Sequence, residues 1–213
     1  MGTNERRKRE KANRRNAILD AAEAIFFKKS VEQSSMDEVA KKAELSKGTL
    51  YLYFHSKEEL FHGIVHRGLT ILLDMFQKVA LGDATGIEKI RDIGRAYFHF
   101  SESYPDYAKS MLHHEKRDIN LKDLENNPNM AKCNADGSKI FTIMQDILLE
   151  GIKDGTIDPT IDPVRMSMVL WAHASGIMNL IQMKGDLIKH LSGVDKTAIM
   201  EYSMQMHSKS LIP

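Results

Sequence analysis

The side chains best suited to binding phosphate and base edges are concentrated in residues 46–57. This stretch reads SKGTLYLYFHSK. Lysine ammonium groups and serine, threonine and tyrosine hydroxyls can donate hydrogen bonds to phosphate oxygens, and small residues allow a close approach to base edges. Lys47, Gly48 and Thr49 combine these properties in three consecutive residues. The stretch therefore predicts a contact with nucleic acid.

Two short predicted helices position these side chains. Ser35 is expected to cap the first helix, and Ser46 is expected to cap the second, which covers residues 47–53. Residues 43–45 form the connector. Two short helices joined in this way indicate a helix-turn-helix at about residues 35–54, whose second helix enters the major groove.

The side chains of the second helix divide into two groups. Leu50, Leu52 and Phe54 are interpreted as core, because leucine and aromatic residues at this spacing pack against neighbouring helices. The polar and basic side chains are interpreted as DNA contacts, since both caps, the turn and the basic flank agree. These residues are Lys47, Thr49, Tyr51, Tyr53 and Lys57.

Three motifs between residues 16 and 60 follow one family pattern. They are the run Ile18, Leu19, Ala21, Ala22 and Phe26, the motif Lys-Gly-x-Leu-Tyr-x-Tyr-Phe at 47–54, and Lys-Glu-x-Leu at 57–60. On these residues the chain resembles the N-terminal domain of the tetracycline-repressor (TetR) family. The resemblance implies capping and a phosphate contact for Ser35, and a DNA contact for His55. The predicted DNA-binding residues are Ser35, Ser46, Lys47, Gly48, Thr49, Tyr51, Tyr53, His55 and Lys57.

The chain departs from that family pattern at two turns. The family usually carries a glycine after the opening helix and another in an Ala-Gly-Val connector. This chain has Ser30-Val31 and Ala43-Glu44-Leu45 at those places. The connector must therefore make its turn without glycine.

Charge is divided unevenly along the chain. Up to Lys57 there are 13 Lys or Arg against 8 Asp or Glu, and beyond it there are 17 against 21. A basic first part indicates nucleic-acid binding there, since neutralising phosphates releases counterions. Residues 1–15 are expected to form an arm along the DNA backbone or in the minor groove, or else a solvated, disordered tail. Their basic side chains are Arg6, Arg7, Lys8, Arg9, Lys11, Arg14 and Arg15.

Several classes of protein do not fit the sequence. No apolar run approaches the length of a bilayer span and no apolar segment follows the N-terminal charges, so a cytoplasmic protein is expected. The single cysteine, Cys133, excludes an intramolecular disulfide. His62 and His66 lie one helical turn apart, but a pair does not make a metal site, and no metal or cofactor is predicted. No nucleophile elbow, phosphate loop or dinucleotide glycine pattern supports an all-helical enzyme.

Beyond Lys57 the spacing of apolar residues is helical, with no convincing strand pattern. The predicted fold class is all-α, with a three-helix DNA-binding domain at 1–57 and a helical effector-binding and dimerisation domain at 58–213. Helices in the second domain are expected at about 58–80, 87–104, 105–111, 140–154, 163–184 and 195–208, with a loop at 126–129.

The last two predicted helices carry apolar residues on more than one face, including Val169 and Ile177 on one and Tyr202 and Met206 on the other. A helix that exposes one side to solvent would carry apolar residues on the opposite face alone. Pairing with a second copy would form a four-helix interface, as the resemblance also implies. Two recognition helices related by a two-fold axis would read a palindromic operator in double-stranded DNA.

The resemblance places a small-molecule effector in the second domain. Aromatic and methionine walls with a few hydroxyls suit an adaptable pocket for a lipophilic ligand, although each residue taken singly is equally well interpreted as core. The candidate ligand-binding residues are Tyr97, Phe98, Ser101, Met111, Met144, Trp171, Ser175 and Met178.

The predicted function is a homodimeric transcriptional regulator, a repressor that a small-molecule effector releases from its operator. The alternative is an effector-independent architectural factor of the same fold. An open cavity in the second domain would favour the regulator, whereas a sealed, fully packed domain would favour the architectural factor.

Overall fold

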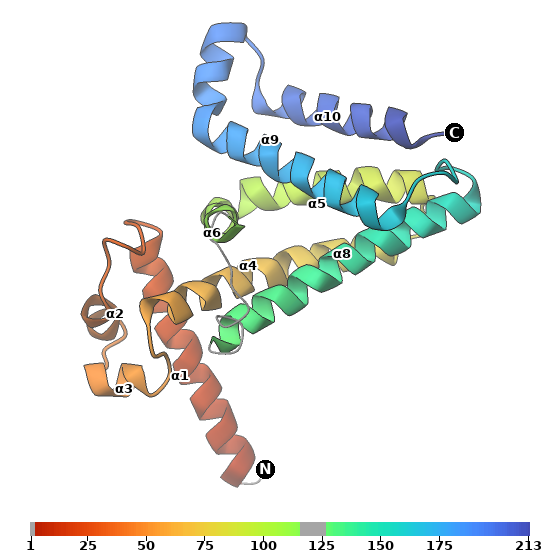
Figure 1. Cartoon of the computed structure of the whole chain (residues 1–213). Helices are drawn as coiled ribbons and strands as arrows, with labels where there is room; N and C mark the ends of the chain where they lie inside the picture. The colour runs from red at the N-terminus through yellow and green to blue at the C-terminus, as the bar shows by residue number, and fades with distance from the viewer. Residues whose placement is uncertain (1–2, 116–126) are drawn as a thin grey trace. The chain divides into compact units, whose positions relative to one another are not determined.

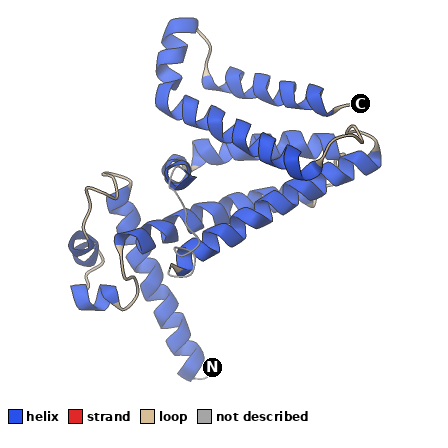
Figure 2. Ribbon diagram, in the orientation of Figure 1, coloured by secondary structure: helices blue, strands red, loops and turns tan. Residues whose placement is uncertain are grey.

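The computed structural model describes residues 3–115 and 127–213, and all regular structure in these ranges is α-helix (Figures 1 and 2). This confirms the predicted all-α class. Contacts group the described residues into a head unit, residues 3–67 with 127–133, and a body unit, residues 68–115 with 134–213. The helices are α1 (Thr3–Phe26), α2 (Met36–Lys42), α3 (Lys47–Tyr51), α4 (Lys57–Ala80), α5 (Gly86–Ser103), α6 (Pro105–Glu115), α8 (Pro128–Asp154), α9 (Pro163–Ser192) and α10 (Lys196–Leu211).

The head unit packs α1 against α2, and α2 against α3. Its fully buried side chains are Ile18, Ala22, Val39, Leu50, Phe54, Leu60, Ile64 and Val65. The burial of Leu50 and Phe54 confirms their interpretation as core residues. The same interpretation of Leu52 was wrong, because its side chain is 77% exposed. Leu52 keeps the helical conformation and lies two residues after the buried Leu50, so it points to the opposite side of the helical turn.

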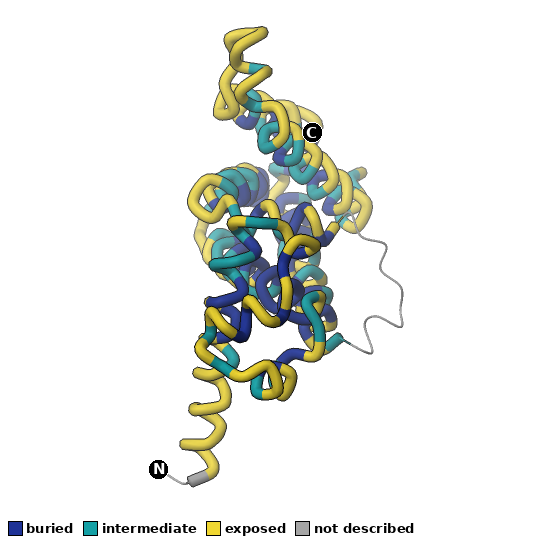
Figure 3. Tube along the Cα trace, turned by 90° about the vertical axis from the view of Figure 1, so that its left-hand side faces the viewer, coloured by how far each residue is buried: buried dark blue, intermediate teal, exposed yellow. Residues whose placement is uncertain are grey.

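Over the residues that the structure describes, the predicted basic arm is helical and not a disordered tail, and its contact with DNA stays a prediction. From Thr3 onward it is the beginning of α1, and its basic side chains from Arg6 to Arg14 are exposed (Figure 3). Extending an existing helix avoids the cost of nucleating a new one, and the Arg6–Glu10 ion pair of 2.8 Å links two turns.

The body unit is organised around α5, which contacts α6, α9 and α10. Two glycines allow α5 and α8 to approach each other closely. A Cβ added to Gly86 would lie 2.2 Å from the Cα of Gly151. Beside this contact Lys89 Nζ pairs with Glu150 Oε1 at 2.7 Å, and Gly86 N–H donates to Asp154 Oδ2 at 2.8 Å.

Two helices of the second half are longer than predicted. α9 continues past residue 184 to Ser192, where Gly193 ends it in the left-handed region at φ 73°. α8 begins at Pro128, so the loop predicted at 126–129 was wrong for Pro128 and Asn129, while Asn126 lies outside the described residues. Asn127 Oδ1 caps α8 by accepting from the N–H groups of Asn129 and Met130, at 3.1 Å each.

The boundary between the two units lies within α4, between residues 67 and 68. The functional boundary predicted at Lys57 coincides instead with the first residue of α4. The boundary between residues 67 and 68 divides the chain by contacts, whereas the boundary at Lys57 divides it by function. The functional boundary stays a prediction. No helix in the described ranges is long and apolar enough to cross a membrane.

Candidate DNA-binding surface and effector pocket

The two caps predicted for the helix-turn-helix are present. Ser35 Oγ accepts from Glu38 N–H at 3.2 Å, while Ser35 N–H donates to the Glu38 carboxylate at 2.9 Å, forming a complete capping box. Ser46 Oγ accepts from Thr49 N–H at 3.1 Å. Both predictions about the ends of α2 and α3 are therefore confirmed.

The connector between α2 and α3 makes its turn through a strained residue. Glu44 has φ 55°, and it is the one non-glycine residue with positive φ among those described. This conformation costs a residue with a Cβ roughly 1–2 kcal/mol. The position is the middle of Ala43-Glu44-Leu45, where the family pattern usually has glycine. The chain therefore forms this turn with a residue that has a Cβ, at the cost of backbone strain at Glu44.

The polar edge of α3 faces outward. Lys47, Gly48 and Tyr51 are exposed, and Thr49 is half-buried. Lys47 Nζ pairs with Asp37 at 2.7 Å, but both side chains are more than half exposed, so this pair is weak and can exchange for a phosphate. The structure thus brings the predicted residues of α3 together on one accessible surface.

Gly48 has no steric reason to be glycine within this chain. A Cβ built on it would meet nothing nearer than Ser46 Oγ, at 4.0 Å. Glycine inside a helix costs about 1 kcal/mol relative to alanine. Packing among the described residues therefore does not account for a glycine at this position.

Lys57 holds a loop in this conformation. Its Nζ donates to the carbonyl oxygens of Val31, Glu32 and Ser34 at 2.9, 3.2 and 2.8 Å. An ammonium group has three N–H bonds, and all three are used. The predicted phosphate contact of Lys57 stays a prediction, and it requires at least one of these bonds to exchange. His55 is exposed, and its N–H donates to Glu59 Oε2 at 2.7 Å.

Arg15 joins α1 to the end of the helix-turn-helix. Its guanidinium lies 4.1 Å from the ring centroid of Phe54, and it donates to Tyr53 O at 3.1 Å and to Asn129 Oδ1 at 2.6 Å. Burial lowers the pKa of Arg15, and the carboxylate of Glu59 partly offsets this shift. The sequence analysis counted Arg15 among the basic residues of the arm and missed this structural role.

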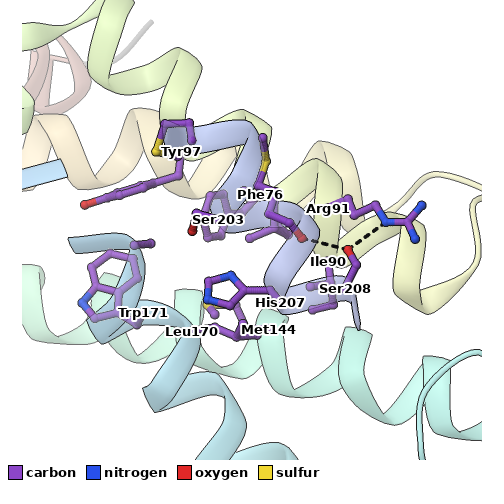
Figure 4. A pocket seen from close by; sticks show the side chains of 15 residues that line it. Phe76, Ile90, Arg91, Tyr97, Met144, Leu170, Trp171, Ser203, His207 and Ser208 are labelled. Atoms are coloured by element: carbon purple, nitrogen blue, oxygen red, sulfur yellow. Dashed lines mark hydrogen bonds between the residues drawn. The ribbon is translucent and has the colours of Figure 1, made fainter. Parts of the chain in front are cut away.

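An apolar pocket lies among α4, α5, α8, α9 and α10 in the body unit, with a volume of about 50 Å³. Figure 4 shows Tyr97 and Trp171 at one end and Arg91 at the other. Ligand pockets usually measure roughly 300–1,000 Å³, so an effector must widen this one. The lining residues are Phe76, Ile90, Arg91, Ile93, Gly94, Tyr97, Met144, Leu170, Trp171, Ala174, Met200, Ser203, Met204, His207 and Ser208.

Three of the predicted ligand-binding residues, Tyr97, Met144 and Trp171, line this pocket, and Phe98 lines a neighbouring groove. The structure places the others outside both linings; they are Ser101, Met111, Ser175 and Met178. All eight stay predictions as ligand contacts.

The sequence analysis missed the contribution of α10 to the pocket wall. Met200, Ser203, Met204, His207 and Ser208 follow the spacing of one helical face. The sequence already shows this periodicity. The same helix also carries apolar residues on another face, which led to the prediction of a dimerisation role alone.

The aromatic end of the pocket also carries a polar atom. The ring centroids of Tyr97 and Trp171 are 5.5 Å apart, and Phe141 packs on the other side of Trp171 at 5.7 Å. Burial raises the pKa of Tyr97 to about 12. A hydrogen bond with Ser175, which lies outside the pocket lining, partly offsets this shift, and the phenol is protonated near neutral pH. No group of three or more metal-ligating side chains occurs among the described residues.

Comparison with known proteins finds a family match for the head unit and relatives of similar length. The family model for bacterial regulatory proteins of the tetR family matches residues 18–64. The transcriptional repressor KstR2 of Mycolicibacterium smegmatis is 25% identical over 151 residues, which cover 71% of each chain.

Two solved structures share the fold. FadR from Bacillus subtilis, solved with stearoyl-CoA, is 21% identical with a TM-score of 0.72, covering 90% of this chain and 96% of that one. AibR, solved with isovaleryl coenzyme A and operator DNA, is 18% identical with a TM-score of 0.67, covering 91% and 97%. With the capped helix-turn-helix at residues 35–54, these findings show that residues 18–64 match the tetR family of bacterial regulatory proteins and that the chain shares the fold of these two regulators.

Proposed function

We propose that this protein is a transcriptional repressor that binds its operator through α3 and leaves it when an effector occupies the body unit. The observation that carries the proposal is Gly48, which is exposed and open to space within a capped recognition helix. A DNA backbone or base edge is what a missing side chain at this position of a helix-turn-helix would admit. Because its target is DNA, we place the protein in the cytoplasm.

The repressor is a homodimer in this proposal. Helix α9 exposes large apolar side chains along its length, with the small residues Ala172 and Gly176 between them. A Cβ on Gly176 would meet nothing within 4 Å, which leaves room for a second helix to approach. The exposed apolar side chains of α9 are Val164, Met168, Val169, Leu180, Met183, Leu187 and Leu191. Pairing this face with its copy would cover them and set two recognition helices on a palindrome.

Two continuous helices provide a route from effector to DNA. α4 carries Phe76 and α8 carries Met144, both on the pocket wall. At its other end each helix belongs to the head unit, where Asn129 of α8 donates to Glu59 O of α4 at 2.9 Å and accepts from Arg15. Widening the pocket would displace both helices and move the recognition helices out of register with successive major grooves, roughly 34–36 Å apart.

The effector class follows from the pocket and from the relatives. The pocket is lined mainly by apolar side chains, with Ser203 and His207 between its ends, the aromatic rings of Tyr97 and Trp171 at one end and Arg91 at the other. FadR from Bacillus subtilis was solved with stearoyl-CoA and AibR with isovaleryl coenzyme A. We infer that the effector of this protein is an acyl thioester of coenzyme A, with its acyl chain in the pocket.

The first test is a selection of bound duplexes from random DNA, using the full-length protein at physiological salt. A palindromic site bound far above background is expected. Acyl-CoA thioesters from butyryl-CoA to stearoyl-CoA are then added, and one or more should weaken operator binding several-fold to about a hundred-fold, the range of a coupling of roughly 1–3 kcal/mol.

Gly48→Ala tests the role of α3 directly. We expect a folded protein whose operator affinity falls at least about tenfold, or about 1.4 kcal/mol. The matched control is Gly137→Ala in α8, where an added Cβ also meets nothing within 4 Å. Unchanged operator affinity of Gly48→Ala would contradict the proposed close approach.

A second function is favoured by the small volume of the pocket. At about 50 Å³ the body unit is nearly sealed, as an effector-independent architectural factor of this fold would be. In that case the selection would return DNA without a preferred sequence, and no thioester would change the affinity for DNA.

A further inference from the structure

A wide groove between α5 and α10 opens beside the apolar pocket. Its volume is about 770 Å³. Arg91, Met200, Met204 and Ser208 line both the pocket and the groove, so the two spaces share a wall. The remaining groove residues are Arg95, Phe98, Thr197, Glu201, Gln205 and Lys209. A ligand that reaches out of the narrow pocket past Arg91 enters this groove.

The groove is predominantly basic. Arg91, Arg95 and Lys209 line it against one acidic residue, Glu201. Arg91 Nε donates to Ser208 Oγ at 2.9 Å, and this hydroxyl donates in turn to Met204 O at 2.9 Å (Figure 4). A neutral hydroxyl thus positions Arg91 through Nε, which leaves the N–H groups of its two terminal nitrogens for an anion. The carboxylate of Glu88, three residues earlier on α5, also interacts with the charge of Arg91.

The other two cations are equally accessible. Arg95 pairs with Asp92 at 2.7 Å on the same helix, but its side chain is 67% exposed, so this pair contributes little. Lys209 is exposed, and no carboxylate lies within 4.0 Å of its ammonium among the described residues. Arginine forks and lysine point charges at the mouth of a pocket are the donors that phosphate groups require.

The groove would stay open in the proposed dimer. On α10, Glu201, Met204 and Ser208 face the groove, whereas Tyr202 and Met206 are the exposed apolar residues. At about 100° per residue, these two sets lie on different flanks of the helix. An interface that covers Tyr202 and Met206 therefore leaves this flank accessible, and Lys209, seven residues after Tyr202 and three after Met206, lies at the border between the interface and the groove.

We propose that this groove binds the phosphorylated nucleotide end of a coenzyme A thioester whose acyl chain lies in the pocket. This inference rests on the proposed function and adds the site of the headgroup. The pocket is too narrow for a nucleotide, and the groove is large enough for one and carries the opposite charge. Arg91, Arg95 and Lys209 contact the phosphates, and they favour the thioester over the free fatty acid.

The test compares two probes with the same acyl chain. One is the tightest-binding member of the series from butyryl-CoA to stearoyl-CoA, and the other is its pantetheine thioester, which lacks the phosphorylated nucleotide. Binding of both is measured by calorimetry with wild type and Arg95→Gln/Lys209→Gln. We expect at least about a tenfold loss of affinity for the coenzyme A thioester, and less than a twofold change for the pantetheine thioester.

The matched control is Lys109→Gln/Lys153→Gln, which removes the same charge from exposed positions on α6 and α8. It should lose less than twofold for either probe. An unchanged affinity of the groove variant for the coenzyme A thioester, or an equal loss for both probes, would overturn the headgroup site. If the pantetheine thioester still releases the operator in that case, the proposed function stands without the groove. If wild type binds neither probe, both proposals fail.

Discussion

The head unit and the body unit encode their sites in different ways. In the head, Ser35 and Ser46 each cap a helix by a hydrogen bond to a residue three positions later. In the body, Met144 and Met200 lie on one pocket wall although a long stretch of chain separates them. Because local hydrogen bonds form the DNA-binding surface, a short motif is enough to predict it. The pocket wall forms only when helices distant in the sequence pack together.

The Gly86 contact gives the largest expected effect and tests the claim that the body depends on long-range packing. Gly86→Ala would place a Cβ 2.2 Å from the backbone of α8. We expect about 3 kcal/mol of lost stability, since neither backbone can yield easily. Urea unfolding followed by circular dichroism measures this. Gly137→Ala is the control and should be neutral or stabilising; a small effect of Gly86→Ala would show that the body tolerates looser packing.

Arg15 tests whether the head is as local as its motif suggests. Arg15→Ala removes the contact with Phe54 and the hydrogen bonds to Tyr53 and Asn129. We expect about 2 kcal/mol of lost stability, because polar groups lose their partners in a half-buried site. Arg14→Ala removes the same charge from an exposed neighbour. Equal melting temperatures of the two variants would contradict a structural role of Arg15.

Glu44 provides a smaller effect of opposite sign. Glu44→Gly should stabilise the protein by about 1 kcal/mol, because glycine adopts positive φ without the Cβ penalty. Glu44→Ala keeps the penalty and should leave the melting temperature nearly unchanged. If both variants behave alike, the strain at φ 55° does not limit the stability of the connector.

The smallest effect concerns pH and the pocket. Burial, and secondarily the charge of His173, lowers the pKa of His207 below its usual 6.5. The folded state therefore binds this proton less readily than the unfolded chain, so the contribution to stability is complete above about pH 6.5 and falls as the pH drops below it. His207→Gln should reduce the difference in unfolding midpoint between about pH 5 and about pH 7.5. The exposed His190→Gln is the control, and an unchanged difference in the His207 variant would exclude this contribution.

The sequence analysis succeeded where the determinants are close in sequence. The caps at Ser35 and Ser46 and the buried Leu50 and Phe54 follow from spacing alone. It failed for Leu52, because residues two apart on a helical turn lie on opposite sides, so Leu52 does not share the buried side of Leu50. It also failed at the start of α8, although Asn127 and Pro128 carry the ordinary signature of a capped helix start.

The sequence by itself determined the all-α class, the helix-turn-helix and the residues that α3 presents, because helix periodicity and caps act over a few residues. Tertiary structure decided which side chains share a space. It joined Arg15 to Asn129, engaged all three N–H bonds of Lys57 and placed α10 against α5 to form the pocket and its basic groove. Such contacts depend on how helices pack, and many packings are compatible with the same apolar spacing.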